Sequence, residues 1–384
     1  MIVRVLLISP VAGHDVPGGD VSYTEALVAR PPRGVTYTTY VDALAEGSLV
    51  ERGRRPRHGA VRPADAVILG ARVAELGLRR AGLAFREPYR YLTVDPAAFD
   101  LVHAHVFAVR LVHTAQPLVT SSGFPLPVLY EDRFHWSGRR VRVAAAGERA
   151  LAGVTRAEVP WLPPRHAAVT MVQSVHYRNH LIAAGAEPDR VAVRTLAIEG
   201  DAGVPRTGPP RTVGFVSTNF EGKGGPVVLA AFRTLVTEYP DARLLIVGSD
   251  PRPVDAGLPP GSVEWVGNVP RGQVLASIYP RIDVLAHPTS CDSGPPYVIL
   301  EALQRGVPVV TTDLPWIDEG LAGAGARRVP ADPDRVAGAL LELFDPATYP
   351  GEARGAVDLW SRRYAMDVVA EQIGATYRAA LAPG

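Results

Sequence analysis

A single lysine stands among forty basic side chains, and its neighbours are suited to binding an anion. The chain has 384 residues and 40 Lys and Arg together, and Lys223 is its one lysine. Lys223 lies in the run Gly222-Lys-Gly-Gly-Pro226, after an apolar segment and before a segment with helical spacing. Loop amides and a helix N-terminus bind phosphate, and a compact ammonium group adds a full charge. The pattern predicts a diphosphate site, and the alternative is an ordinary turn between a strand and a helix.

A carboxylate interrupts the apolar run Val298-Ile-Leu-Glu-Ala-Leu303, which has helical spacing. The run follows a strand that ends at His287 and a loop of small residues. Glu301 therefore lies at a solvent edge or accepts hydrogen bonds from two neighbouring hydroxyl groups, as on a ribose. An isolated helical Glu favours the first interpretation. The phosphate-type loop in the same half of the chain favours the second.

Two histidines and one aromatic cluster are further candidates. His103 and His105 alternate along a strand, so both side chains share one face of it. No third ligand stands at a fitting spacing, so we predict no metal site, and His105 is a candidate for binding a substrate, with a packed histidine as the alternative. The run Tyr130–Trp136 suits a polar, ring-shaped ligand or a solvated loop. Cys291 has no histidine base beside it in sequence and is not predicted as a nucleophile.

These residues lie between alternating strands and helices. The chain opens with a strand over 2–8, a Gly-rich loop over 9–19 and a helix over 20–29, and we expect loops with one helix over 125–164. The alternation starts again at 212, with strands expected over 212–216, 243–247, 263–266 and 284–287. Between the two halves, 199–211 holds three glycines and three prolines and reads as a linker. The sequence therefore predicts an α/β protein with two doubly wound domains and ligands at the carboxyl ends of the strands.

Composition excludes several classes of protein. The net charge is +1, so the chain lacks the strong basic balance of a general nucleic-acid binder. With one cysteine it forms no intramolecular disulfide, which fits a reducing compartment. No apolar stretch is long enough to span a membrane, and the N-terminus lacks a signal-peptide pattern. We expect a cytoplasmic protein without an integral membrane segment.

The motifs of the second half resemble those of a known enzyme family. They are Lys223-Gly224, Gly267-Asn-Val269, His287-Pro-Thr-Ser290, Ser293-Gly294, Glu301-Ala302 and Gly306-Val-Pro-Val309. Their spacing resembles retaining glycosyltransferases of the GT-B fold, family 4 (group 1) type, well over about 210–380 and less closely over 1–200. The resemblance implies two Rossmann-like domains facing a cleft: 1–200 for the acceptor, linker 201–211, 212–362 for a sugar nucleotide, and a C-terminal helix 363–384 returning to the first domain.

The same resemblance assigns roles to individual residues. Lys223 would hold the diphosphate and Glu301 the ribose hydroxyl groups, and these two are the expected catalytic residues. The other expected donor-binding residues are Gly18, Gly19, Thr218, Gly267, Val269, Asp292, Ser293 and Gly294. The expected acceptor-binding residues are His105, Ser122 and Glu131. No metal or other cofactor is expected besides the nucleoside diphosphate sugar itself.

Three positions depart from the family pattern. The family has an Arg five residues before the Lys, and Thr218 stands here. It has a Glu eight residues before the ribose Glu, and Ser293 stands here, next to Asp292. It often has a His where this chain has Ser122. These changes remove a phosphate clamp and sugar contacts. Either the donor sugar is unusual, deoxygenated or modified, or the chemistry is lost, and the retained Lys223 and Glu301 favour an unusual donor.

The expected reaction moves a sugar, with retention, from a nucleoside diphosphate to a small-molecule acceptor. The chain is expected to be a bacterial enzyme of specialised metabolism and a monomer or homodimer. A sugar-nucleotide epimerase or hydrolase, or a non-catalytic sugar-nucleotide-binding protein, is the alternative. The sequence leaves the base open among UDP, GDP, dTDP and ADP.

Overall fold

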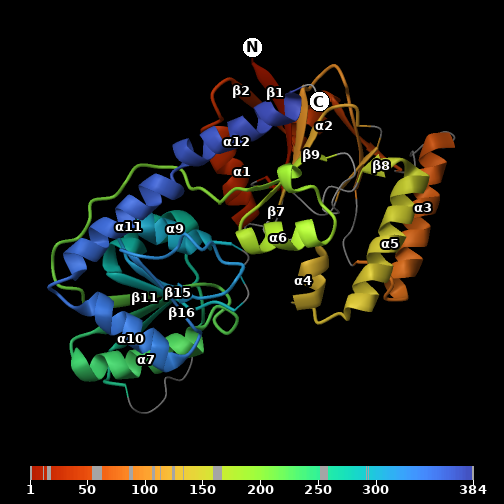
Figure 1. The fold of residues 1–384 in the computed structure, drawn as a ribbon. Helices are drawn as coiled ribbons and strands as arrows, with labels where there is room; N and C mark the ends of the chain where they lie inside the picture. The colour runs from red at the N-terminus through yellow and green to blue at the C-terminus, as the bar shows by residue number, and fades with distance from the viewer. Residues whose placement is uncertain are drawn as a thin grey trace. The chain divides into compact units, whose positions relative to one another are not determined.

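The chain forms two compact units in the computed structural model (Figure 1). The structure describes residues 2–11, 13–14, 19–53, 63–85, 90–105, 109–112, 114–122, 126–132, 134–158, 167–250, 258–290, 292 and 294–382. Unit 1 is Met1–Arg194 with Ala370–Gly384, and unit 2 is Thr195–Val369. The predicted linker 201–211 belongs to unit 2, where the Gly203 amide donates to the Gln304 carbonyl at 2.7 Å. The Pro- and Gly-rich composition correctly indicated a loop here, and this loop packs against unit 2.

The first sheet of unit 1 has six parallel strands in the order β10-β9-β7-β5-β1-β2. The strands are β1 (Val3–Ile8), β2 (Val35–Thr39), β5 (Leu101–Ala104), β7 (Leu118–Ser122), β9 (Ala167–Val172) and β10 (Val191–Val193). The connecting helices are α1 (Gly19–Ala29), α2 (Tyr40–Glu46), α6 (Val175–Ala183) and the 3-10 turn Pro188–Arg190. The last helix of the chain, α12 (Met366–Leu381), adds its residues from Ala370 onward to this unit.

A second, four-stranded sheet in unit 1 was not predicted. Its order is β3-β4-β6-β8, with β4 and β6 parallel and both outer pairs antiparallel. The strands are β3 (Leu49–Arg52), β4 (Arg90–Val94), β6 (Val109–Val112) and β8 (Ala157–Glu158). The helices of this part are α3 (Pro63–Arg80), α4 (Leu126–Asp132) and α5 (Gly138–Thr155), and α3 and α5 pack on each other (Figure 1, orange and yellow).

The aromatic cluster at Tyr130–Trp136 belongs to the core of this part. Tyr130 and Trp136 are buried and pack edge to face, with ring centroids 4.6 Å apart, and both contact Phe85. The interpretation of Tyr130–Trp136 as a ligand-binding or solvated loop is therefore wrong for these two side chains. Burial of large apolar rings outweighs the charged residues between them.

The sheet of unit 2 has six parallel strands in the order β13-β12-β11-β14-β15-β16. The strands are β11 (Thr212–Val216), β12 (Arg243–Val247), β13 (Val263–Gly267), β14 (Val284–His287), β15 (Val309–Thr312) and β16 (Ala326–Val329). The helices are α7 (Gly225–Glu238), α8 (Arg271–Gln273), a π turn (Val274–Ile278), a 3-10 turn (Tyr279–Arg281), α9 (Tyr297–Gln304), α10 (Pro333–Phe344) and α11 (Tyr349–Arg363). The predicted doubly wound α/β class is confirmed in both units.

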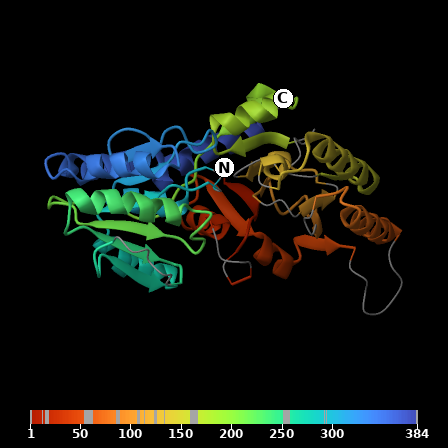
Figure 2. The same cartoon turned by 90° about the horizontal axis from the view of Figure 1, so that it is seen from below.

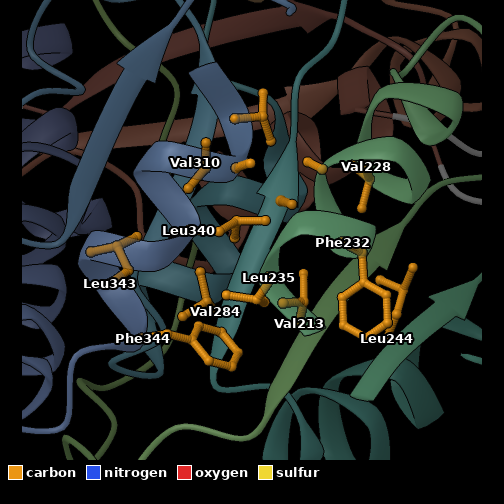
Figure 3. Close-up of a cluster of buried hydrophobic side chains, with 14 of the residues drawn as sticks. Val213, Val228, Phe232, Leu235, Leu244, Val284, Val310, Leu340, Leu343 and Phe344 are labelled. Carbon is orange, nitrogen blue, oxygen red and sulfur yellow. The ribbon is translucent and has the colours of Figure 1, made fainter. Parts of the chain in front are cut away.

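Helices cover both faces of the unit 2 sheet. On one face α7 and α10 pack side by side (Figure 2), and on the other α9 packs against α11. Figure 3 shows the core under α7 and α10, where Phe232 and Leu340 meet strand residues such as Val213. These three side chains are fully buried, and each such residue contributes about 1.5–3 kcal/mol by removal from water. This core holds the loops at the carboxyl ends of the strands on a rigid base.

Candidate functional site

Lys223 lies in the loop that joins β11 to α7. The amide of Lys223 donates to the Asn219 carbonyl at 3.1 Å, and the amide of Gly222 donates to Asn219 Oδ1 at 3.0 Å. Gly224 has a φ of +84°, and a Cβ there would lie 2.3 Å from the Pro288 carbonyl oxygen. Only glycine allows this approach, which brings the lysine loop against the loop after β14.

The ammonium group of Lys223 forms an ion pair with Asp292 from the loop after β14. The other carboxylate oxygen of Asp292 lies 3.3 Å from His287 Nε2. Burial raises the pKa of Asp292, but the hydrogen bond from His287 and the charge of Lys223 outweigh it and hold the pKa well below the ordinary value. Asp292 is therefore ionised and acts as an acceptor only. Two predicted donor residues are in contact, and His287, at the end of its strand, joins them.

Glu301 is buried on α9, with 4% of its surface exposed. Its Oε1 accepts from Arg271 Nε at 2.9 Å, and its Oε2 accepts from the Tyr279 hydroxyl at 3.0 Å. Burial, and then the charge of Glu301, raise the pKa of Tyr279 well above its ordinary value, so the phenol remains a donor. Glu301 therefore does not face open water. Arg271 and Tyr279 were not predicted, because their spacing from Glu301 in sequence carries no signal.

The remaining described residues of unit 2 that were predicted to bind the donor lie at the same edge of the sheet. Gly267 ends β13 with a φ of +73°, and its carbonyl accepts from the Gly248 amide at 2.8 Å. Val269 follows two residues later and is half-buried, and Thr218 is exposed just after β11. The Gly294 amide donates to the Trp316 carbonyl at 3.1 Å. Ser293 and Cys291 lie outside the described residues.

The predicted residues of unit 1 fall into two places. His105 follows β5 and is 5% exposed, with Nδ1 2.6 Å from Ser121 Oγ and Nε2 3.2 Å from Asp20 Oδ1. Ser122 ends the neighbouring strand β7, and Gly19 begins α1 and is exposed. Glu131 lies apart from this strand edge, on α4, which packs against α5. Gly18 lies outside the described residues.

Lys223, the ionised Asp292 and the buried Glu301, with its partner Arg271, thus lie in the loops and the helix that follow strands of one parallel sheet. The carboxyl edge of such a sheet is where α/β proteins bind nucleotides. Within the described segments no group of three His, Cys, Asp or Glu side chains could hold a metal ion. None of the helices there is both long and apolar enough to cross a bilayer.

Comparison with known proteins matches the part of the chain that carries these loops. Residues 210–345 match the model of the family described as glycosyl transferases group 1. A phosphatidyl-myo-inositol mannosyltransferase of Mycolicibacterium smegmatis is 35% identical over 185 residues, which are 46% of this chain and 46% of that relative. The chain therefore spans about half the length of the relative that it matches.

Solved structures match the fold over nearly the whole chain. The Anabaena protein HepE in complex with UDP has a TM-score of 0.60 at 16% identity, and covers 98% of this chain and 100% of its own. A sucrose-phosphate synthase from Thermosynechococcus elongatus has a TM-score of 0.59 at 16% identity and covers 98% of each chain. A glycosyltransferase from Rickettsia africae has a TM-score of 0.58 at 12% identity, with 100% of both chains covered. The expected GT-B fold of two Rossmann-like domains is confirmed.

Proposed function

We propose that this chain, whose residues 210–345 match the model of the glycosyl transferases group 1 family, is a retaining glycosyltransferase that uses a nucleoside diphosphate sugar. Unit 2 binds the donor and unit 1 the acceptor. The observation that carries the proposal is that Lys223, in the loop after β11, and Glu301, on α9 after β14, follow two neighbouring strands of one parallel sheet. A cation at a helix-initiating loop suits a diphosphate, and a buried carboxylate suits the ribose hydroxyl groups.

The chemistry follows from these charges. The bond between the anomeric carbon and the β-phosphate oxygen breaks, and negative charge develops on the departing diphosphate. Lys223 and the loop amides stabilise that charge, so they bind the transition state more tightly than the donor. The acceptor oxygen attacks the same face of the sugar, which retains the configuration. Its proton passes to the departing phosphate oxygen.

Lys223 and Glu301 both have ion-pair partners in the protein, so the donor must either replace a partner or bind beside it. Asp292 pairs with Lys223, and Arg271 pairs with Glu301. Arg271 is half exposed, so its guanidinium group can leave the carboxylate without opening the core. Asp292 is one residue before Ser293, where the family has a Glu for sugar hydroxyl groups. We propose that Asp292 turns from Lys223 to the donor sugar when the diphosphate arrives.

The acceptor is proposed as a small molecule with a free hydroxyl group. The mannosyltransferase relative is named for a substrate that carries an inositol ring, which supports a polyol acceptor. The departures at Thr218, Ser293 and Ser122 support a donor sugar with fewer or modified hydroxyl groups. The assignment to bacterial specialised metabolism rests on these departures.

Thermal unfolding with UDP, GDP, dTDP and ADP tests the donor site. A nucleotide at about 100 times its Kd stabilises the chain by roughly 2.7 kcal/mol, a shift of several degrees. We expect one nucleotide to give this shift and Lys223→Ala to abolish it. Arg362→Ala, which removes an exposed cation on α11, should keep the shift. No shift with any of the four nucleotides would contradict the proposal.

Turnover then separates transfer from other chemistry. The matching nucleoside diphosphate sugars are incubated with and without myo-inositol and phosphatidylinositol as acceptor probes, and products are identified by mass spectrometry. Transfer should give a glycosylated acceptor with the donor's anomeric configuration, and Lys223→Ala should lose most of it. Release of free sugar or an epimerised donor as the sole product would favour a hydrolase or an epimerase.

A further inference from the structure

Helix α12 places a tyrosine hydroxyl group against the first sheet of unit 1. Tyr377 OH lies 2.7 Å from His103 Nδ1 and 2.9 Å from the hydroxyl of Tyr37 on β2. On the other side of the imidazole ring, His103 Nε2 lies 2.7 Å from Ser121 Oγ on β7. Burial lowers the pKa of His103 to about 3. The ring is therefore neutral and carries one N–H.

Ser121 extends this chain of hydrogen bonds to the expected acceptor site. Ser121 Oγ lies 2.6 Å from His105 Nδ1, and His105 Nε2 lies 3.2 Å from Asp20 Oδ1. The ring of Tyr23 covers His105, with the ring centroids 4.1 Å apart. The histidine side chain is 3% exposed and that of Asp20 is 69% exposed. A buried line of side chains thus ends in one exposed carboxylate.

The charge of Asp20 at one end of the line and the hydroxyl group of Tyr377 at the other favour the same direction for these hydrogen bonds. The hydrogen bond with His105 holds the pKa of Asp20 below its ordinary value, so the carboxylate accepts. With one N–H on each imidazole ring, His105 Nε2 donates to this carboxylate and His105 Nδ1 accepts from Ser121. The Ser121 hydroxyl group has one hydrogen, which it donates to His105 Nδ1, so its oxygen accepts from His103 Nε2. His103 Nδ1 is left as an acceptor, and Tyr377 donates to it.

Removing the hydroxyl group of Tyr377 makes the reverse direction of these hydrogen bonds more favourable than it is in the unsubstituted chain. Nothing then donates to His103 Nδ1, and the Nδ1–H tautomer of His103 is no longer opposed. In that tautomer Nε2 accepts from Ser121. The hydroxyl group of Ser121 then donates its one hydrogen bond to His103, and His105 Nδ1 loses its donor. A hydroxyl on the last helix therefore controls a hydrogen bond of His105, three side chains away.

We propose that Tyr377 is a positioning residue: its hydroxyl selects the tautomer of His103 and, through Ser121, holds the ring of His105 with Nε2–H directed at Asp20. The line of side chains supports the exposed carboxylate of Asp20 from a helix far along the chain. Its role in holding an acceptor hydroxyl group rests on the proposed function. The selection of tautomers does not, because it is a property of unit 1 without substrate.

The test is imidazole ¹⁵N NMR of the full chain with labelled histidine. Each of its 10 histidines reports which ring nitrogen carries the proton, and His103→Asn and His105→Asn assign the two signals. In the unsubstituted chain we expect Nε2–H on both rings. In Tyr377→Phe the ratio of the His103 tautomers should shift toward Nδ1–H by about fivefold to tenfold, the effect of one hydrogen bond. The His105 Nδ1 signal should move as well, since Ser121 no longer donates to it.

Tyr91→Phe is the matched control. It removes a buried hydroxyl group of unit 1 that has no hydrogen-bond partner among the described residues, and it should leave both signals unchanged. Unchanged His103 and His105 signals in Tyr377→Phe would overturn the proposal. If Tyr377→Phe does not fold, the unsubstituted chain still decides, because Nδ1–H on either ring would also overturn it. No donor or acceptor is used, so failure here and failure of the proposed transfer are distinguishable.

Discussion

At the scale of single residues, each unit 2 charge that we propose to bind the donor is paired with an opposite charge of the protein. Lys223 pairs with Asp292, and Glu301 pairs with Arg271. An anion that binds Lys223 therefore competes with the carboxylate of Asp292 for the ammonium group. A nucleoside diphosphate without its sugar must break this ion pair, which weakens its binding. A complete donor also breaks the pair, but its sugar gives Asp292 new hydrogen-bond partners.

Asp292→Asn tests this competition. The amide cannot form an ion pair with Lys223 or repel a diphosphate, so the nucleoside diphosphate that stabilises the chain should bind more tightly. The expected gain is about 1 kcal/mol, or roughly fivefold, since the pair is only partly buried. Titration calorimetry measures it. Asp313→Asn, which breaks the exposed pair with Arg328, should have no effect, and weaker binding in Asp292→Asn would contradict the argument.

Tyr279→Phe tests the support of Glu301. The buried carboxylate loses a hydrogen bond, which costs about 1.5–3 kcal/mol of the free energy of unfolding because the acceptor is charged. Denaturation in urea measures the loss. Tyr239→Phe is a suitable control because this tyrosine is only partly buried, at the edge of the core of unit 2. Equal stability of Tyr279→Phe and the original chain would show that Glu301 does not depend on this hydroxyl.

The sequence predicted that Lys223 and Glu301 follow strands of one sheet, because each strand is succeeded by a loop of small residues and a helix. Asp292 was named only from the family resemblance, and its ion pair with Lys223 had no signal in the sequence. The sequence did not predict Arg271 or Tyr279. Their contacts depend on how the segment after β13 folds back on α9, and neither residue type nor spacing encodes that path. The orientation of His105 depends likewise on Tyr377, which is 272 residues further along the chain.

At the scale of elements, the alternation of apolar runs and Gly-rich loops predicted the strands β11, β12, β13 and β14 nearly to the residue. It failed in the first half, over 125–164, where one helix and loops were expected. Ser137 caps α5 by accepting from the Arg140 amide, and the helix runs for 18 residues. Its many arginines and few large apolar residues hid its buried face. The second sheet was missed because its strands are too short to show a clear alternation of apolar and polar residues.

Gly224→Ala tests the element that positions Lys223. The substitution must adopt a φ of +84° and places a Cβ against the backbone of Pro288. Gly261 has a similar φ of +75° but open space around its Cβ position, so Gly261→Ala reports the backbone strain alone. We expect a cost of about 1–2 kcal/mol for Gly261→Ala. Gly224→Ala should cost more, with weakened nucleotide binding. Equal urea midpoints for the two variants would show that the close approach is unimportant.

At the scale of the whole molecule, the two ends of the sequence share one unit. Residues from Ala370 onward belong to unit 1, where Arg194 Nε donates to Thr376 at 3.1 Å and Tyr377 meets Tyr37. The stability of the first sheet therefore depends on residues that lie far along the chain from its strands. Sequence spacing alone gave no sign of this, and the expectation of a returning helix came from the family resemblance.

Ile373→Ala tests this dependence. Ile373 is 1% exposed, and its truncation should cost about 2–5 kcal/mol. Amide hydrogen exchange should accelerate in β1, β2 and β5 of unit 1, although the substitution lies in the last helix. Leu340→Ala, in the core of unit 2, should accelerate exchange in β11 and β14 instead. Because local stability follows contiguous packed units, faster exchange confined to α12 itself would mean that the helix frays without supporting the sheet.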